Sequence, residues 1–551
     1  MSSAVGAIPK TAGGVVPELT GRAAPEDTGV SCDPAGNYNT RTFHRLQRPL
    51  ILPNLLCLPY LLAMAGLDSK PPHVVLLASP GMGHLIPVLV LGKRLVTLHN
   101  FKVTIFVVAS HSSGGGAESD VLQAATSQNL CQVVELPAVD MSGVVSPGAA
   151  VVTQLAVMMR EIKPALRSAI SALEHPPAAL IVDLFGSESM AVADEFGVPK
   201  FVYVPSNAWF LALSVYSPIL DKVVEGEYVN QKEPLAIPGC TSVRPEDVVD
   251  PMLDRTNQQY VEYVRMGVEY TRSDGILLNT WEDLQPTTLA ALRDEKLLGR
   301  VVKVPVYPIG PLLRTTEQPS SESLLFHWLD SQPRTSVIYV SFGSGGTLSV
   351  EQMVEVAWGL ELSQQRFVWV VRKPTAKSGD GSFFTSGNGR DDDPLSYLPQ
   401  GFLTRTHNLG LMVRDWAPQT GILSHPSTGG FLSHCGWNST LESITNGVPM
   451  IAWPMYAEQR LNATLLVEEL GVAIRPRFSP SKAVVRREEI AEMIRKVMVE
   501  EEGANIRKQV AELKCRAEKA LSEGGSSRKA LSQVAKECEL SWERLSLKSH
   551  P

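Results

Sequence analysis

The sequence lacks paired cysteines and lacks any dense run of basic residues, and each absence argues against a class of protein. Its seven cysteines are scattered over 551 residues, and no two form a Cys-x-x-Cys pair. This argues against a disulfide framework or a zinc module and favours a reducing compartment, so we expect a cytoplasmic protein. A net charge of −7 without a Lys/Arg stripe argues against nucleic acid as a partner.

The first part of the chain shows no apolar periodicity, which is typical of disorder. An apolar run of nearly membrane-spanning length follows it, but three prolines and an asparagine inside the run argue against stable membrane insertion: PLILPNLLCLPYLLAMAGL. We predict that residues 1–70 are a disordered or artefactual extension and that Met64 is the natural start. An organelle-targeting extension is the alternative.

From His73 onward, short apolar runs alternate with helical patterns such as Thr153–Leu173. The runs are HVVLLAS, KVTIFVVAS, ALIVDLF, KFVYVPS and GILLNTW, and then SVIYVSFGSGG, RFVWVVR, GLMVRDW, GGFLSH and PMIAWP. This alternation predicts an α/β protein with parallel sheets covered on both faces. A polar segment at residues 313–323 divides the pattern into two Rossmann-like domains, 71–315 and 324–525. We expect a C-terminal helix, 526–545, to pack back on the first domain.

Ligands bind beyond the carboxyl ends of the strands in open α/β sheets, and two facing halves form a cleft between them. His84 follows the first predicted strand in the turn SPGMGHLIP. The third glycine of a dinucleotide fingerprint is missing there, so this turn is weak evidence for a nicotinamide cofactor. Asp183 ends the strand ALIVD, where it either caps the next helix or orients His84 as a general base. No G-x-S-x-G elbow supplies a serine nucleophile, so we expect the dyad to deprotonate a substrate hydroxyl.

The stretch GGFLSHCGWNSTLE ends a predicted strand at about His434, turns at Gly436 and begins a helix near Asn438. Such a helix start attracts phosphate, and His434 adds a donor. Ser439 and Glu442 have the spacing of a capping box, which is the structural alternative to a role in binding. Thiol chemistry is disfavoured because Cys435 is predicted to be buried. Metal binding is disfavoured because no further ligands have a recognised spacing, and the Asp391–Asp393 run is typical of a solvated loop.

The segment WAPQTGILSHPSTGGFLSHCGWNSTLESITNGVPMIAWPMYAEQ, residues 416–459, resembles the signature box of plant secondary-product UDP-glycosyltransferases. SPGMGHLIP and IVDLFG also resemble this family, most closely its members that glucosylate small phenols and monolignols. The resemblance covers the chain from about His73 to the C-terminal helix. It implies a GT-B fold, with two facing Rossmann-like domains, and no cofactor or metal beyond UDP-glucose as co-substrate.

The resemblance also implies roles for individual residues. Trp416 would stack on uracil, with the backbone of Ala417 and Gln419 at its edge, and Glu442 would bind the ribose. The diphosphate would be held by His434, Asn438, Ser439 and Ser344, with Trp437 near the sugar–phosphate region. Glu458, where aspartate is commoner, and Gln459 would bind the hexose. Candidate acceptor contacts are His84, Ser206, Trp209, Phe210 and Ala457.

The function expected from these residues is inverting transfer of glucose to a hydroxyl, expected to be phenolic, of a small plant metabolite. His84 would take the proton, and Asp183 would stabilise the imidazolium. Flavonoid or terpenoid acceptors, or a catalytically silent binding protein on the same fold, are the alternatives. We expect a monomer.

Overall fold

The computed structural model describes residues 70–108, 121–122, 130–146, 148–314, 323–375 and 393–549. The predicted extension of residues 1–70, with Met64 and its apolar run, lies outside the described residues except for Lys70. Among the residues that are described, no helix combines the length and the apolar composition needed to cross a bilayer.

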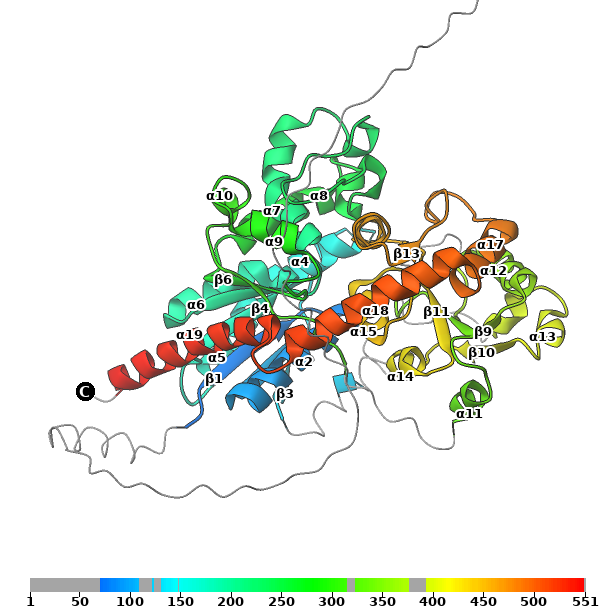
Figure 1. Cartoon of the computed structure of the whole chain (residues 1–551). Helices are drawn as coiled ribbons and strands as arrows, with labels where there is room; N and C mark the ends of the chain where they lie inside the picture. Colours follow the sequence, from blue (N-terminus) through cyan, green and yellow to red (C-terminus); the bar gives the residue numbers. More distant parts are fainter. Residues whose placement is uncertain are drawn as a thin grey trace, which may run out of the picture. The chain divides into compact units, whose positions relative to one another are not determined.

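The first half of the described chain forms a parallel sheet of seven strands in the order β3-β2-β1-β4-β5-β6-β7 (Figure 1). Its strands are β1 (His73–Ala78), β2 (Lys102–Val108), β3 (Gln132–Leu136), β4 (Ala179–Asp183), β5 (Lys200–Val204), β6 (Gly275–Leu278) and β7 (Val306–Pro308). The chain order reverses between β1 and β4, which lie side by side with Leu77 paired to Val182. Such a reversal is where open α/β sheets bind their ligands.

The second half forms a parallel sheet of six strands in the order β10-β9-β8-β11-β12-β13. Its strands are β8 (Val337–Ser341), β9 (Arg366–Val371), β10 (Gly410–Arg414), β11 (Thr428–Ser433), β12 (Met450–Ala452) and β13 (Ala473–Ile474). Here the order reverses between β8 and β11. The predicted α/β class with two Rossmann-like parallel sheets is confirmed.

Continuous apolar runs form these strands because both faces of each sheet are covered. In β1, Val75 and Leu77 belong to one buried cluster, whereas Val74 and Leu76 belong to another on the opposite face. Side chains alternate between faces along a strand, so a run without polar residues is needed to fill both cores.

Helices cover the sheets and connect the strands. In the first half they are α2 (Met82–His99), α4 (Val151–Glu161), α5 (Lys163–Ser171), η1 (Leu184–Met190), α6 (Ala191–Phe196), α7 (Ala208–Val223), η2 (Tyr228–Asn230), η3 (Pro245–Asp247), η4 (Asp250–Leu253), α8 (Gln258–Tyr270), α9 (Pro286–Arg293) and α10 (Gly299–Val302). The helix predicted over 153–173 is two helices, because Pro164 has no backbone N–H with which to continue the hydrogen-bond ladder of α4.

The second half begins with α11 (Leu324–Asp330) and continues with α12 (Val350–Ser363), η5 (Pro394–Tyr397), α13 (Phe402–Arg405), α14 (Gln419–Ser424), α15 (Trp437–Asn446), α16 (Gln459–Thr464), the π-helical η6 (Leu465–Glu469), α17 (Arg487–Met498), α18 (Glu501–Leu521) and α19 (Ser526–Ser549). The last two form the C-terminal helical segment, drawn in orange and red in Figure 1. Helix α18 contacts α15, while α19 contacts α2 and β7 of the first half.

Helix α19 completes the core of the first half. Leu531 and Val534 are 1% and 0% exposed and pack in the same cluster as residues of β1 and α2. The Tyr307 hydroxyl donates to Glu537 at 2.5 Å. The last helix therefore returns to the domain in which the chain's first described strand lies.

Replacing Leu531 by alanine tests this packing. The change removes buried methyl groups and leaves a cavity, so we expect the free energy of unfolding to fall by about 2–5 kcal/mol. The control is Leu540→Ala on the same helix, where the side chain is 48% exposed, and it should change stability by less than about 0.5 kcal/mol. Denaturant unfolding measures both, and equal losses would contradict the packing role of α19.

Candidate active site

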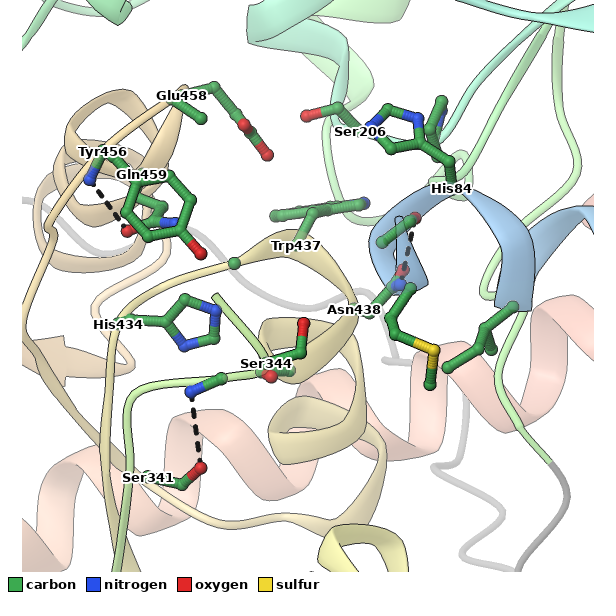
Figure 2. A pocket seen from close by; sticks show the side chains of 18 of the residues that line it. His84, Ser206, Ser341, Ser344, His434, Trp437, Asn438, Tyr456, Glu458 and Gln459 are labelled. Carbon is green, nitrogen blue, oxygen red and sulfur yellow. Dashed lines mark hydrogen bonds between the residues drawn. The ribbon is translucent and has the colours of Figure 1, made fainter. Parts of the chain in front are cut away.

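Residues that follow the strands at both reversal points line one cavity of about 360 Å³ (Figure 2). The loops after β1 and β4 contribute Met82–His84 and Leu184–Phe185, and the turns after β8 and β11 contribute Gly343–Ser344 and His434. The cavity has the size of a small-molecule site.

His84 and Asp183 come together at the first reversal point. His84 stands in the first turn of α2, after Gly81, which has a φ of 105° and turns the chain sharply out of β1. Its Nδ1 lies 3.2 Å from a carboxylate oxygen of Asp183, although the angle falls short of an aligned hydrogen bond. Since Nδ1 faces Asp183, Nε2 on the other side of the ring is left for a ligand in the cavity.

Asp183 is fully buried and accepts hydrogen bonds from the protein. Its donors are the backbone N–H and hydroxyl of Ser79, at 3.0 and 2.5 Å, and the N–H of Gly186 at 3.2 Å. The last contact caps η1. Asp183 therefore caps a helix and also faces His84. These donors offset the cost of burying a carboxylate and fix its position.

Helix α15 directs its N-terminus at the cavity, which Gly436, Trp437, Asn438 and Ser439 line. The helix begins at Trp437 and has no side-chain cap. The capping-box alternative for Ser439 and Glu442 is therefore wrong, because the N-cap is Gly436 and Ser439 lies inside the first turn. Gln419 Nε2 instead donates to both side chains, at 2.9 and 2.6 Å. Backbone N–H groups of a first turn have no partner within their helix, so this end is suited to an anion.

The ring of His434 fits between two glycines. A Cβ at Gly343 or Gly436 would lie 2.4 or 2.5 Å from its Nε2. Burial lowers the pKa of His434 to about 4, so the imidazole is neutral at pH 7, with one N–H donor and one acceptor. Its Nδ1 is buried and has no partner among the described residues, which indicates a site that a ligand completes. Cys435 is buried, as predicted, and burial raises the pKa of its thiol to about 12.

Trp416, Ala417 and Gln419 line another part of the cavity. The Trp416 side chain is 46% exposed, an unusual position for so large an apolar surface, and it offers a flat ring for stacking. The backbone N–H of Gln419 donates to the Ala417 carbonyl at 2.8 Å, so this N–H is already engaged within its own turn. Burial raises the pKa of Glu442 to about 7.

Glu458 and Gln459 line the cavity from the turn before α16. The side-chain oxygen of Gln459 accepts from the backbone N–H groups of Met455 and Tyr456, at 3.0 and 3.1 Å, which leaves its amide NH₂ as a donor. Burial raises the pKa of Glu458, which accepts from Asn462 Nδ2 at 3.4 Å. The two side chains therefore offer a carboxyl acceptor and an amide donor, the partners that sugar hydroxyls need.

Two side chains of α15 also join the halves of the chain. The Trp437 indole N–H donates to the carbonyl of Asn279 at 2.7 Å, and Asn438 Nδ2 donates to the carbonyl of Gly83 at 3.2 Å. Gly83 precedes His84, so the start of α15 is held directly against the turn that carries the histidine. Figure 2 shows Trp437 between the His434 side and the His84 side of the cavity.

The wall near His84 is mostly apolar. Phe185 lies beside His84 with ring centroids 5.2 Å apart and the rings tilted by 53°. Phe210 and Ser206, two of the candidate acceptor contacts, also line this wall. Trp209 differs from the prediction: it is fully buried and is absent from the cavity lining, because its position in the first turn of α7 turns the ring into the core. Ala457 lines the cavity beside Glu458.

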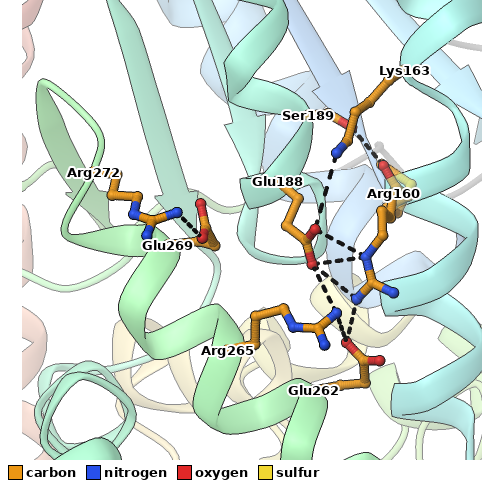
Figure 3. A network of polar contacts seen from close by, with 9 residues as sticks. Arg160, Lys163, Glu188, Ser189, Glu262, Arg265, Glu269 and Arg272 are labelled. Carbon is orange, nitrogen blue, oxygen red and sulfur yellow. Dashed lines mark hydrogen bonds and ion pairs between the residues drawn. The ribbon is translucent and has the colours of Figure 1, made fainter.

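A network of ion pairs links the helices that contribute to this wall, and Figure 3 shows its side chains. The Arg160 guanidinium at the end of α4 donates to both oxygens of Glu188 on η1, each at 2.9 Å, and also to Glu262 on α8. Helices α4, η1 and α8 each also contribute side chains that line the cavity. The network therefore fixes the spacing of the elements that form the wall.

Several lining residues escaped the sequence prediction, among them Phe185, Asp250, Gln259 and Arg314. Phe185 stands two positions after Asp183, and the rule that strand ends carry site residues was enough to find it. Asp250, in the segment VVDPM, belongs to no period or motif, so no sequence signal marked it.

Within the described ranges, no group of three or more His, Cys, Asp or Glu side chains is arranged to hold a metal ion. Asp393 of the acidic run caps η5 and pairs with Arg414 at 2.8 Å. Its neighbours Asp391 and Asp392 lie outside the described residues.

Comparison with known proteins agrees with this geometry. Residues 305–480 match the family described as UDP-glucoronosyl and UDP-glucosyl transferase. Anthocyanidin 3-O-glucosyltransferase 5 of Manihot esculenta is 64% identical over 476 residues, covering 86% of this chain and 97% of that protein. Hydroquinone glucosyltransferase of Rauvolfia serpentina is 44% identical over 467 residues, covering 84% and 97%.

The crystal structure of TcCGT1 in complex with UDP is similar with a TM-score of 0.80 and 50% identity, covering 86% of this chain and all of that one. The two facing parallel sheets and the C-terminal helices are those of the GT-B fold, as the resemblance implied. With relatives this similar over nearly their full length, the chain belongs to the UDP-glycosyltransferase family and is an enzyme of that class.

Proposed function

We propose that the enzyme transfers glucose from UDP-glucose to a phenolic hydroxyl of a small plant metabolite, with inversion at the anomeric carbon. The observation that carries this proposal is the single cavity that joins the His84–Asp183 pair on one wall with the α15 N-terminus, His434 and Trp416 on the other. One wall suits proton removal, and the other suits a nucleoside diphosphate.

In this proposal the nucleoside lies on the ring of Trp416, a residue that is 46% exposed. The backbone carbonyl of Ala417 keeps a free lone pair for the uracil edge, and the N–H of Gln419 must be released from its own turn. Glu442 accepts from the ribose hydroxyls beside the amide of Gln419, which already contacts that carboxyl at 2.6 Å.

The diphosphate is assigned to the start of α15. Unpaired backbone N–H groups and the positive end of the helix dipole attract its charge. His434, Ser344, Asn438 and Ser439 add donors, with Trp437 beside them. His434 acts as a neutral donor, since its low pKa prevents protonation at physiological pH. These groups also stabilise the UDP that departs, the role that a metal has in other transferases.

Glu458 and Gln459 are assigned to the hexose hydroxyls. A site built from such polar partners rejects a sugar that leaves them unpaired, which is the physical basis of donor selectivity. This supports UDP-glucose without excluding a related hexose donor.

The reaction itself is an in-line displacement. His84 Nε2 accepts the phenolic proton as the oxygen attacks the anomeric carbon, and Asp183 stabilises the resulting imidazolium. The new C–O bond forms on the face opposite the breaking bond to the diphosphate, so UDP leaves with the electron pair and the product is a β-glucoside. An ordinary phenol has a pKa of about 10, which makes a base useful at pH 7.

The acceptor is proposed to be a phenol because the wall beside His84 is aromatic and apolar, and the Ser206 hydroxyl there has no partner in the part of the chain that the structure describes. The name of the Rauvolfia relative supports a simple phenol. A flavonoid acceptor is the second candidate, favoured by the name of the Manihot relative. UDP release from UDP-glucose with each acceptor separates these candidates and would expose a silent binding protein. A cytoplasmic, monomeric enzyme is proposed on the unpaired cysteines and on the self-contained cavity of one chain.

Replacing His84 by alanine tests the base. We expect turnover of UDP-glucose and a phenol to fall by at least about 10²-fold, because no general base then takes the proton of the phenolic hydroxyl. UDP affinity, measured by calorimetry, should be unchanged. His175→Ala, at a half-exposed site, is the control and should keep full activity. Turnover at the wild-type rate in the His84 variant would refute the assignment.

The pKa of Glu442 gives a pH prediction. Ribose hydroxyls favour the carboxylate, so binding lowers a pKa that stands at about 7 in the free enzyme and releases a proton. Affinity for UDP-glucose should therefore rise by up to about tenfold from pH 6 to pH 8 and then level off. UDP-glucose is used in place of UDP because the terminal phosphate of UDP itself ionises near pH 6 and would add its own pH dependence.

Glu442→Gln removes the titrating group and should give an affinity that no longer changes over this range. His434 does not interfere, because its pKa of about 4 lies below the range. A pH dependence that persists in the Glu442 variant would point to Glu458, whose pKa is also raised, and would contradict the assignment of Glu442.

A further inference from the structure

The turn that carries Glu458 and Gln459 contains a residue in a costly conformation. Ala457 has a φ of 56°, in the left-handed region that a residue with a Cβ avoids. Such a conformation persists only where the surroundings hold it. The contacts of Ala457 therefore decide whether the next two side chains face the cavity.

Those contacts come from the other half of the chain. A carboxylate oxygen of Asp250 accepts from the Ala457 N–H at 2.6 Å, and the Asp250 N–H donates to the Ala457 carbonyl at 3.0 Å. Asp250 begins η4, in the half that carries His84. Both backbone groups of the strained residue are thus bonded to one aspartate.

Arg460 fixes the position of that aspartate. Its guanidinium pairs with the other carboxylate oxygen of Asp250, and its Nε donates to the carbonyl of Val248 at 3.3 Å. The Arg460 side chain is only 3% exposed, so the ion pair is shielded from water and its charge depends on this partner.

We infer that Asp250 is a positioning residue for the hexose site: by holding Ala457 in the left-handed conformation, it aims Glu458 and Gln459 at the sugar only when the two halves of the enzyme are joined. This inference rests on the proposed assignment of Glu458 and Gln459 to the hexose. Figure 2 shows Glu458 directed toward the side of the cavity where Ser206 and His84 lie.

The nucleotide site does not depend on this contact. Trp416, Gln419 and Glu442 come from other segments, and within the described ranges the hydrogen bonds and the ion pair of the Asp250 carboxylate go to Ala457 and Arg460 instead. Loss of Asp250 should therefore weaken the contacts with the sugar and lower the affinity for UDP-glucose, while the affinity for UDP stays unchanged. A residue that only joined the halves would affect both.

The chain offers a matched control. Arg244, close to Asp250 in sequence, pairs across the same junction with Glu468 on η6. That ion pair joins the two halves but does not touch the turn at Ala457. Arg244→Gln thus separates general docking of the halves from positioning of the turn.

The experiment measures the affinities of UDP and UDP-glucose by calorimetry in the same preparation of the full chain. Inactive protein lowers the stoichiometry and leaves the ratio of affinities unchanged. For Asp250→Asn, which keeps the size but loses the charge that pairs with Arg460, we expect UDP-glucose to bind roughly tenfold more weakly and UDP to bind as before. Arg244→Gln should leave both affinities unchanged.

Ala457→Gly tests the mechanism, because glycine adopts this φ without strain. In that background, Asp250→Asn should weaken UDP-glucose by no more than about threefold. An equal loss of UDP and UDP-glucose, or the same tenfold loss in both backgrounds, would overturn the inference.

Glu458→Gln distinguishes this inference from the proposed function. If Glu458→Gln weakens UDP-glucose selectively while Asp250→Asn does not, the hexose assignment stands and the role of Asp250 falls. If neither variant affects UDP-glucose selectively, the hexose assignment itself is wrong, and the inference falls with it.

Discussion

The hydrogen bond from the Trp437 indole to the carbonyl of Asn279 is the contact on which the rest of the site depends. A buried indole N–H needs an acceptor, and here the acceptor belongs to the opposite sheet. The bond holds the N-terminus of α15 at the edge of the first sheet, where Asn438 then reaches Gly83. An anion site and a histidine from separate domains are thereby placed around one cavity. Neither half alone has both.

Burial acts on the titratable groups of this cavity. It keeps His434 neutral, and it raises the pKa values of Glu442 and Glu458, which disfavours their charged forms. Preorganised dipoles would act on the proposed diphosphate at low dielectric, where they are stronger than in water. Asp183 is buried too, and donors from Ser79 and Gly186 surround its carboxyl group beside the ring of His84.

Sequence patterns predicted most of the strands, including β10 at a sheet edge, and missed β3, β7 and β13, which lie at the other edges. Strands such as β1 and β4 are buried on both faces and form long apolar runs, whereas β3 begins with an exposed glutamine and β13 has two residues. His84 and Asp183 were predicted because the carboxyl ends of strands carry site residues in such folds. The helix start beside His434 was predicted as an anion site from the residues, and the other donor contacts came from the resemblance. The role of Asp250 could not be predicted from the sequence, because it depends on how the two halves meet. The direction of the Trp209 ring could not be predicted either, because it depends on the rotation of α7 about its axis.

Backbone strain marks the same cavity. Among the described residues, the non-glycine residues with positive φ include Asn100, Lys303 and Gln364, each of which ends a helix, where this conformation is ordinary. Thr335, Asp415, Cys435 and Ala457 end no helix. Thr335 lies before β8 and away from the cavity lining, whereas each of the other three directly precedes or follows a residue proposed to hold the donor. The left-handed turn at Asp415 precedes the exposed ring of Trp416, and that at Cys435 follows His434. Three strained turns at one site are explained if each directs a neighbouring side chain at the donor. The fold then holds these side chains in place before binding, and the ligand does not have to order them.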